Sequence, residues 1–228
     1  MAAAFDDSLD QTANVMILGD SFVSRLEADL HHGPHVFPQD MPLHVFARDA
    51  LKCPREINHV YFHGVGGAGC TPSASNPFKL PGPLLLRANP KLAIIEIGGN
   101  DVDSPARADD IAINKVDLAY NLIQLYDVRV VALTTIIPRD SCRNISEREF
   151  REKALLVNMM TNQLTEEHPN VIFFKYRSFW TDEVGKRVST VGWSTDGVHP
   201  NTEVGMRKYK KNITSCLHEV VKSYRKLD

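Results

Sequence analysis

The chain alternates short apolar runs with longer segments of helical periodicity, and this alternation limits the folds that it can adopt. Runs too short for helices predict buried strands over residues 14–18, 57–62, 92–97, 129–137 and 171–174. Apolar residues three or four positions apart predict helices over residues 21–30, 106–126, 146–167 and 209–224. The weakly alternating stretch 43–48 favours one more strand, and the prolines between residues 68 and 90 exclude a long helix there.

Strands that alternate with helices predict right-handed βαβ units and a parallel sheet with helices on both faces. In such sheets ligands bind beyond the carboxyl ends of the strands, where the strand order reverses. We therefore expect the functional residues in loops that follow strands. Residues 1–13 are small, polar and acidic, which predicts a loose tail before a single domain over residues 14–228.

Charge and composition exclude several other classes of protein. With 26 basic and 28 acidic residues the formal net charge is −2, so we expect no direct nucleic-acid binding. No apolar run approaches the roughly 18–20 residues needed to span a bilayer, and the first residues do not resemble a secretory signal. We therefore expect a cytoplasmic protein. The basic stretch over residues 207–211 is expected to be the solvated face of the closing helix.

Nothing in the sequence predicts a metal or a cofactor. The four cysteines are scattered and form no CxxC pair, and the cluster His31, His32 and His35 is read as a solvated loop. Residues 64–69 match G-x-G-x-x-G after a predicted strand, which raises the possibility of a dinucleotide site. Pro72 and Pro77 exclude the helix that must follow, and no acidic residue is placed to bind a ribose.

The segments that carry chemistry follow the predicted strands or precede the last helix. Gly19-Asp20-Ser21 follows the first strand, and Asp196 and His199 share a short loop before the closing helix. A serine hydroxyl needs a base to become a good nucleophile, and imidazole titrates near neutral pH. These residues therefore predict Ser21 as nucleophile and His199 as base. Asp196 would orient the imidazole and stabilise its charged form.

Acyl transfer through Ser21 also needs donors for the tetrahedral oxyanion. The backbone N–H of Ser21, the backbone N–H of Gly67 and the side-chain amide of Asn100 are the candidates. Gly67 lies in the glycine-rich loop after residues 57–62, where Gly66 is the alternative. Asn100 belongs to Gly98-Gly99-Asn100-Asp101, which follows residues 92–97. Asp20 and Asp101 are expected to support the site.

Four sequence blocks thus follow one another along the chain: Gly19-Asp20-Ser21, the glycine-rich loop with Gly67, Gly98-Gly99-Asn100-Asp101, and the loop with Asp196 and His199. In this order, the four blocks resemble the SGNH (GDSL-type) hydrolases. The resemblance implies a flavodoxin-like three-layer α/β/α sandwich with a mainly parallel sheet, hydrolysis of carboxylic esters, and no metal or cofactor. It implies Ser21, Asp196 and His199 as the catalytic triad, with Gly67 and Asn100 as oxyanion donors. Phe22-Val23 departs from the leucine that often follows the serine in the family. The compact Gly-Asp-Ser-Phe-Val opening is also similar to SGNH domains in first-frame proteins of some animal non-LTR retrotransposons.

The sequence thus predicts a serine esterase that acts on a small ester, with a short, acetyl-like acyl group, because no lid-like apolar helix lies between the motifs. The partner is then a small ester substrate, either a lipid or an acetylated molecule. The alternative is a non-catalytic module that binds a lipid or acyl ligand, or serves as a scaffold, within a larger retroelement protein.

Overall fold

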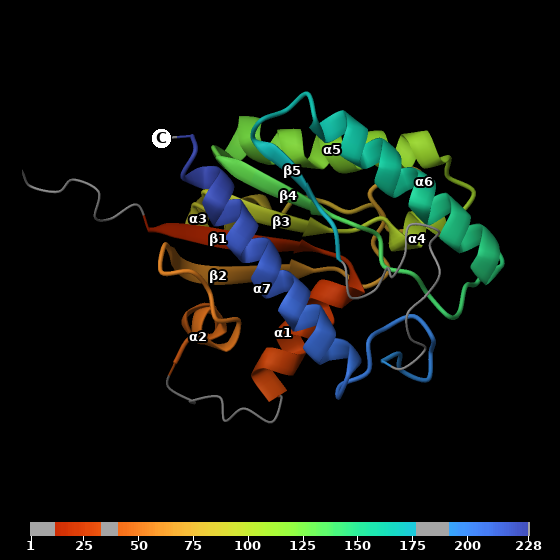
Figure 1. The fold of residues 1–228 in the computed structure, drawn as a ribbon, viewed down its shortest axis with the longest axis horizontal. Coiled ribbons are helices and arrows are strands. Elements are labelled where there is room, and N and C mark those ends of the chain that lie inside the picture. Colours follow the sequence, from red (N-terminus) through yellow and green to blue (C-terminus); the bar gives the residue numbers. More distant parts are fainter. Residues whose placement is uncertain (1–11, 33–40, 177–191, 228) are drawn as a thin grey trace, which may run out of the picture.

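The protein contains a five-stranded parallel sheet flanked by helices (Figure 1). The computed structural model describes residues 12–32, 41–176 and 192–227. Its strands are β1 (Ala13–Gly19), β2 (Ile57–Gly64), β3 (Leu92–Glu96), β4 (Val130–Thr134) and β5 (Val171–Phe174). They lie in the order β2-β1-β3-β4-β5, and every neighbouring pair is parallel. This is the flavodoxin-like order, which confirms the expected fold and places the reversal of strand order beside β1.

Helices pack on both faces of the sheet because successive strand residues point to opposite sides. Val15 and Ile17 of β1 join one apolar cluster, whereas Met16 and Leu18 join the other. The first cluster lies under α1 (Ser21–His32), α2 (Leu43–Ala50) and α7 (Gly205–Tyr224). The second lies under α3 (Gly82–Ala88), α4 (Gly99–Val102), α5 (Ala108–Tyr126) and α6 (Glu147–Thr165). Figure 1 shows α7 running obliquely across one face of the sheet.

The prediction of a strand over residues 43–48 was wrong, because this segment forms the helix α2. Leu43, Ala47 and Ala50 share one helical face and pack against the first cluster, with Ala47 fully buried. In so short a segment, this helical spacing competes with the weak two-residue alternation. Pro42, at the N-cap, suits the start of a helix because it has no N–H to leave unpaired.

Other boundaries differ by a few residues. Strand β1 begins at Ala13, inside the expected tail, whose residues 1–11 lie outside the described chain. Strand β4 ends at Thr134 rather than residue 137. Beyond it, the N–H of Ile136 donates to Asn158 Oδ1 at 2.8 Å, so the backbone bonds a side chain of α6 instead of a neighbouring strand. The predicted capping box of Ser146 and Glu149 is present at the start of α6.

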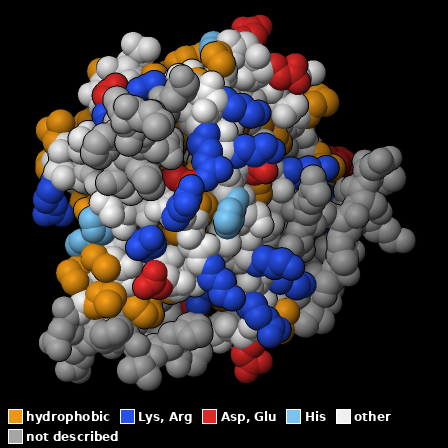
Figure 2. Space-filling model, turned by 60° about the vertical axis from the view of Figure 1, so that its left-hand side comes forward, with side chains coloured by type: hydrophobic (Ala, Val, Ile, Leu, Met, Phe, Trp, Pro, Cys, Tyr) orange, Lys and Arg blue, Asp and Glu red, His pale blue; other side chains and the backbone are white. Residues whose placement is uncertain are grey.

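Helix α7 is amphipathic, as its periodicity predicts. Tyr209, Ile213 and Leu217 are buried, whereas Arg207 and Lys211 are exposed. Figure 2 shows many Lys and Arg side chains gathered on one face of the molecule. None of the helices in the described residues is both long and apolar enough to cross a membrane.

Candidate active site

Ser21 is placed by a tight junction between β1 and α1. Gly19 ends the strand, and a Cβ there would lie 2.0 Å from the carbonyl oxygen of Glu96, so only glycine allows this approach of β1 to β3. The N–H of Asp20 donates to that same carbonyl at 3.1 Å. The buried Asp20 carboxylate accepts the N–H of Phe22 at 3.0 Å, which satisfies a free donor of the first helical turn. Ser21 is therefore held at the N-terminus of α1.

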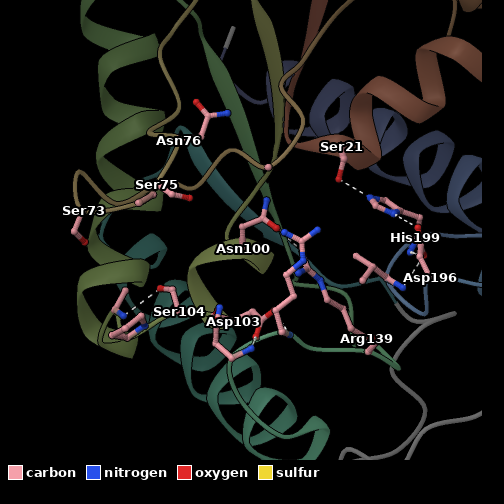
Figure 3. Close-up of a pocket in the computed structure, with 18 of the residues that line it drawn as sticks. Ser21, Ser73, Ser75, Asn76, Asn100, Asp103, Ser104, Arg139, Asp196 and His199 are labelled. Carbon is pink, nitrogen blue, oxygen red and sulfur yellow. Dashed lines mark hydrogen bonds and ion pairs between the residues drawn. The ribbon is translucent and has the colours of Figure 1, made fainter.

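The structure brings Ser21, His199 and Asp196 into one hydrogen-bonded relay (Figure 3). Ser21 Oγ lies 2.7 Å from His199 Nε2, although 178 positions separate the two residues. On the other side of the ring, His199 Nδ1 lies 2.7 Å from Asp196 Oδ2. In this geometry the imidazole can accept the serine proton while the carboxylate stabilises the resulting imidazolium.

The carboxylate of Asp196 is fixed in its ionised form. Partial burial opposes ionisation, but hydrogen bonds outweigh it and hold the pKa of Asp196 well below its usual range. Oδ1 accepts the hydroxyl of Ser194 at 2.5 Å and the backbone N–H groups of Val198 and His199 at 2.9 Å each. Oδ2 also contacts Arg25 of α1 at 3.3 Å. Sequence reasoning missed Ser194 and Arg25; the position of Ser194 two residues before the aspartate was its only local signal.

Aromatic packing holds the histidine ring in place. The ring of Phe22 lies 5.7 Å from that of His199, and it also meets Trp193 and Tyr209 edge-on at 6.5 and 5.7 Å. Phe22 stands where the family often has a leucine, and in this structure its ring packs against His199, the expected base. Trp193 is half-buried and packs against the core rather than lining the cleft.

The candidate oxyanion donors lie on the same cleft as Ser21. Gly67 adopts a φ of +72°, and it lines the cleft whereas Gly66 does not. Within the described part of the chain, no hydrogen-bond acceptor faces the N–H of Gly67. Asn100 also lines the cleft, and its Nδ2 donates one hydrogen to the carbonyl of Ala68 at 2.8 Å. Within the described residues the second hydrogen of that amide has no acceptor.

Asp101 ties the loop after β2 to the loop after β3. Its buried carboxylate accepts the N–H of Cys70 at 2.8 Å, the N–H of Thr71 at 3.0 Å and the hydroxyl of Thr71 at 2.7 Å. These contacts fix the strand-to-helix turn of Asn100 relative to the glycine-rich loop. Asp20 and Asp101, both expected to support the site, thus make structural contacts next to Ser21 and Asn100.

A second group of ionisable side chains lies buried near Asp20, and the sequence reasoning missed it. Glu96, the last residue of β3, accepts the hydroxyl of Thr134 at 3.2 Å, and Lys115 of α5 donates to the Thr134 carbonyl at 2.9 Å. Burial, together with the nearby charge of Asp20, raises the pKa of Glu96 to about 8 despite the opposing effect of Lys115. The signal available was a single glutamate in the apolar run LAIIEI.

The relay opens onto a cleft of about 1190 Å³ with a polar lining (Figure 3). Serine, asparagine and arginine side chains form much of its wall, including Ser73, Ser75, Asn76, Ser104, Arg107, Arg139, Arg143 and Asn144. No group of three His, Cys, Asp or Glu side chains suited to a metal occurs within residues 12–32, 41–176 and 192–227. The prediction of a loop at the histidine cluster was wrong for His31 and His32, which form the exposed last turn of α1, and His35 lies outside the described residues.

Comparison with known families places the chain among the acylhydrolases. Residues 17–204 match the GDSL-like Lipase/Acylhydrolase family, a segment that contains all four sequence blocks. The protein therefore belongs to this family. A search of curated proteins found no match.

Solved structures share the fold at low sequence identity. A GDSL-like lipase from Bacteroides thetaiotaomicron is 17% identical, with a TM-score of 0.58 over 93% of each chain. A carbohydrate acetylesterase from Sinorhizobium meliloti is 18% identical, with a TM-score of 0.59 over 92% of this chain and all of that one. A mutant acetyl esterase with an acetate ion is 16% identical, with a TM-score of 0.57 over 93% of this chain and all of that one.

Proposed function

We propose that the protein is a serine esterase that removes short, acetyl-like acyl groups from a polar alcohol. The observation that carries this proposal is the relay from Asp196 through His199 to Ser21, on one cleft with the candidate oxyanion donors Gly67 and Asn100. Each member of the relay is within hydrogen-bond distance of the next, and the carboxylate is held ionised.

In the proposed reaction, Ser21 Oγ attacks the ester carbonyl carbon while His199 Nε2 takes the hydroxyl proton. The carbonyl oxygen becomes an oxyanion that accepts the N–H groups of Ser21 and Gly67 and the free amide hydrogen of Asn100. Collapse of this intermediate breaks the bond to the alcohol, which leaves with the proton from His199. Water then attacks the acyl-serine with His199 as base, releasing the carboxylic acid and restoring Ser21.

The lining of the cleft supports a short acyl group and a polar alcohol. Around Ser21 the described lining has no large apolar side chain, and its apolar residues are small ones such as Pro105 and Val198, so a long acyl chain would find no extended apolar wall to cover. Hydroxyl and amide groups along the wall, such as those of Ser75 and Asn76, can exchange hydrogen bonds with a hydroxylated alcohol. Two structures with this fold are described as a carbohydrate acetylesterase and an acetyl esterase, and an acetylated saccharide is accordingly the substrate class that we propose.

The alternative, a module that binds a lipid or acyl ligand without turnover, predicts a missing or displaced catalytic group. The positions of Ser21, His199 and Asp196 argue against it. The comparisons give no support to the similarity with retrotransposon proteins, and the proposed chemistry does not depend on it.

Activity of a Ser21→Ala variant tests the proposal. We expect hydrolysis of nitrophenyl acetate and of a peracetylated sugar by the wild type, and a loss of at least about 10³-fold in the variant, because the nucleophile is gone. Ser215→Ala is the matched control, since Ser215 is exposed on α7 and does not line the cleft. An organophosphonate should label Ser21 in the wild type, as read by mass spectrometry. Unchanged turnover in Ser21→Ala, or a label on another residue, would contradict the proposal.

A further inference from the structure

We propose that Arg139 is a positioning residue of the oxyanion site, holding the Asn100 amide in its donating orientation and placing a fixed positive charge beside it. This inference rests on the proposed esterase function. Arg139 follows β4 in the chain, and in Figure 3 it lies between Asn100 and the Ser21–His199 pair.

The first argument is the assignment of both ends of the Asn100 amide. Arg139 Nη2 donates to Asn100 Oδ1 at 3.1 Å, while Asn100 Nδ2 donates to the carbonyl of Ala68 at 2.8 Å. A flipped amide would set its NH₂ group against the guanidinium and its oxygen against the Ala68 carbonyl, so both contacts would become repulsive. Only the observed orientation leaves an amide hydrogen for the oxyanion. Without Arg139, the Asn100 amide would lose one of the two hydrogen bonds that fix this orientation.

The second argument is the unusual state of the arginine. Arg139 is only 4% exposed, yet within the described segments its guanidinium forms no ion pair and its Nε has no hydrogen-bond partner. Buried arginines normally pair with carboxylates because an unpaired charge in a dry site is costly. The ring of Phe150, 5.4 Å from the guanidinium carbon, supplies part of the compensation. The buried Asp20 carboxyl is near enough for an electrostatic interaction with the guanidinium but does not pair with it directly. A cation that lines the cleft without a direct ion pair would favour an anion that forms there during the reaction.

The third argument is the space that the sequence leaves for this side chain. A Cβ on Gly99 would lie 2.6 Å from Arg139 Nη2, so the second glycine of the Gly98-Gly99 pair makes room for the guanidinium. The loop that carries Arg139 also contacts the histidine loop, because the N–H groups of Asp140 and Ser141 donate to the Gly197 carbonyl at 2.7 and 3.2 Å. Arg139 therefore lies where the oxyanion donors and the base loop meet.

A double-mutant cycle between Arg139→Met and Asn100→Ala tests the inference. Loss of an oxyanion donor costs about 10²–10³ in turnover, so we expect Arg139→Met to lower kcat at least about 10-fold on a neutral acetyl ester, with KM changed less than about threefold. In the Asn100→Ala background the same substitution should lower kcat by a clearly smaller factor, because the amide that Arg139 positions is absent and only the effect of its charge remains. Arg139→Lys, which keeps the charge but loses the planar fork, should fall between the wild type and Arg139→Met.

Controls separate failure of this inference from failure of the proposed function. Arg148→Met removes the same charge from an exposed position of α6 and should leave kcat unchanged. Gly99→Ala keeps the arginine but displaces its guanidinium, and it should reproduce the kcat loss if Arg139→Met does not fold. An inactive wild type contradicts the esterase proposal itself. An active wild type with equal losses from Arg139→Met in both backgrounds, or with a change in KM alone, overturns the role of Arg139.

Discussion

Glu96 should make the stability of the protein fall as the pH rises from acid to mildly basic. This carboxyl is 4% exposed and lies near Asp20. Burial first, and then the charge of Asp20, raises its pKa from 4.5 to about 8. Between these two values the native state keeps a proton that the unfolded chain releases, so stability decreases as the pH rises through this window.

The size of the effect follows from the same values. At about 1.4 kcal/mol per pKa unit, the rise from 4.5 to about 8 corresponds to a loss on the order of 5 kcal/mol across the window. Glu96→Gln keeps the shape and cannot ionise, so it should match the wild type near pH 5 and be more stable near pH 8. Burial lowers the pKa of Lys115, which contributes with the opposite sign. The difference between the two proteins therefore reports the ionisation of Glu96 together with its electrostatic coupling to Lys115.

Urea unfolding followed by circular dichroism at several values between pH 5 and pH 8 measures this difference. Glu167→Gln, at an exposed position after α6, is the control and should show the pH dependence of the wild type. Parallel stability curves for the wild type and Glu96→Gln would refute the reasoning, since they would mean that Glu96 is equally ionised in the folded and unfolded chain.

Three further substitutions separate the parts of the site. Asp196→Asn should lower kcat by about 10⁴-fold, because the ring of His199 loses the carboxylate that stabilises its charged form; steady-state kinetics on nitrophenyl acetate measure this. Gly19→Ala would place a Cβ 2.0 Å from the Glu96 carbonyl, so the melting temperature should fall by at least several degrees. Asp101→Asn replaces an acceptor of three hydrogen bonds, so the free energy of unfolding should fall by about 1–3 kcal/mol. We also expect a lower kcat, because the Gly67 loop would be displaced. A wild-type kcat in that variant would contradict the coupling of the two loops.

Much of the fold could be predicted from the sequence because it depends on local patterns. Buried parallel strands are continuous apolar runs, and the five such runs became β1 to β5. The strand prediction for residues 43–48 was wrong because six residues hold too few apolar positions to distinguish a two-residue period from a 3.6-residue period. Its packing against the first apolar cluster, which decides between them, depends on the rest of the chain.

The candidate site was partly predictable for a geometric reason. Strands β2, β1 and β3 are neighbours, so the loops after them meet at one edge, and Gly67, Ser21 and Asn100 line the same cleft. Arg139 also follows a strand, yet nothing local separates it from an ordinary surface arginine. Its importance depends on burial, on the missing side chain of Gly99 and on the orientation of an amide far along the chain.

The two halves of the relay are held by different means. Ser21 is fixed by the sheet, because Gly19 and Asp20 contact β3 directly. His199 lies on a loop that precedes α7 and follows no described strand, and backbone bonds from Asp140 and Ser141 to the Gly197 carbonyl connect this loop to the segment after β4. The 2.7 Å contact between Ser21 and His199 thus depends on how the segment after β4 meets that loop, as well as on the contacts that Phe22 and Arg25 of α1 make with it. Changes at that junction should separate the proposed base from the proposed nucleophile while leaving the sheet intact.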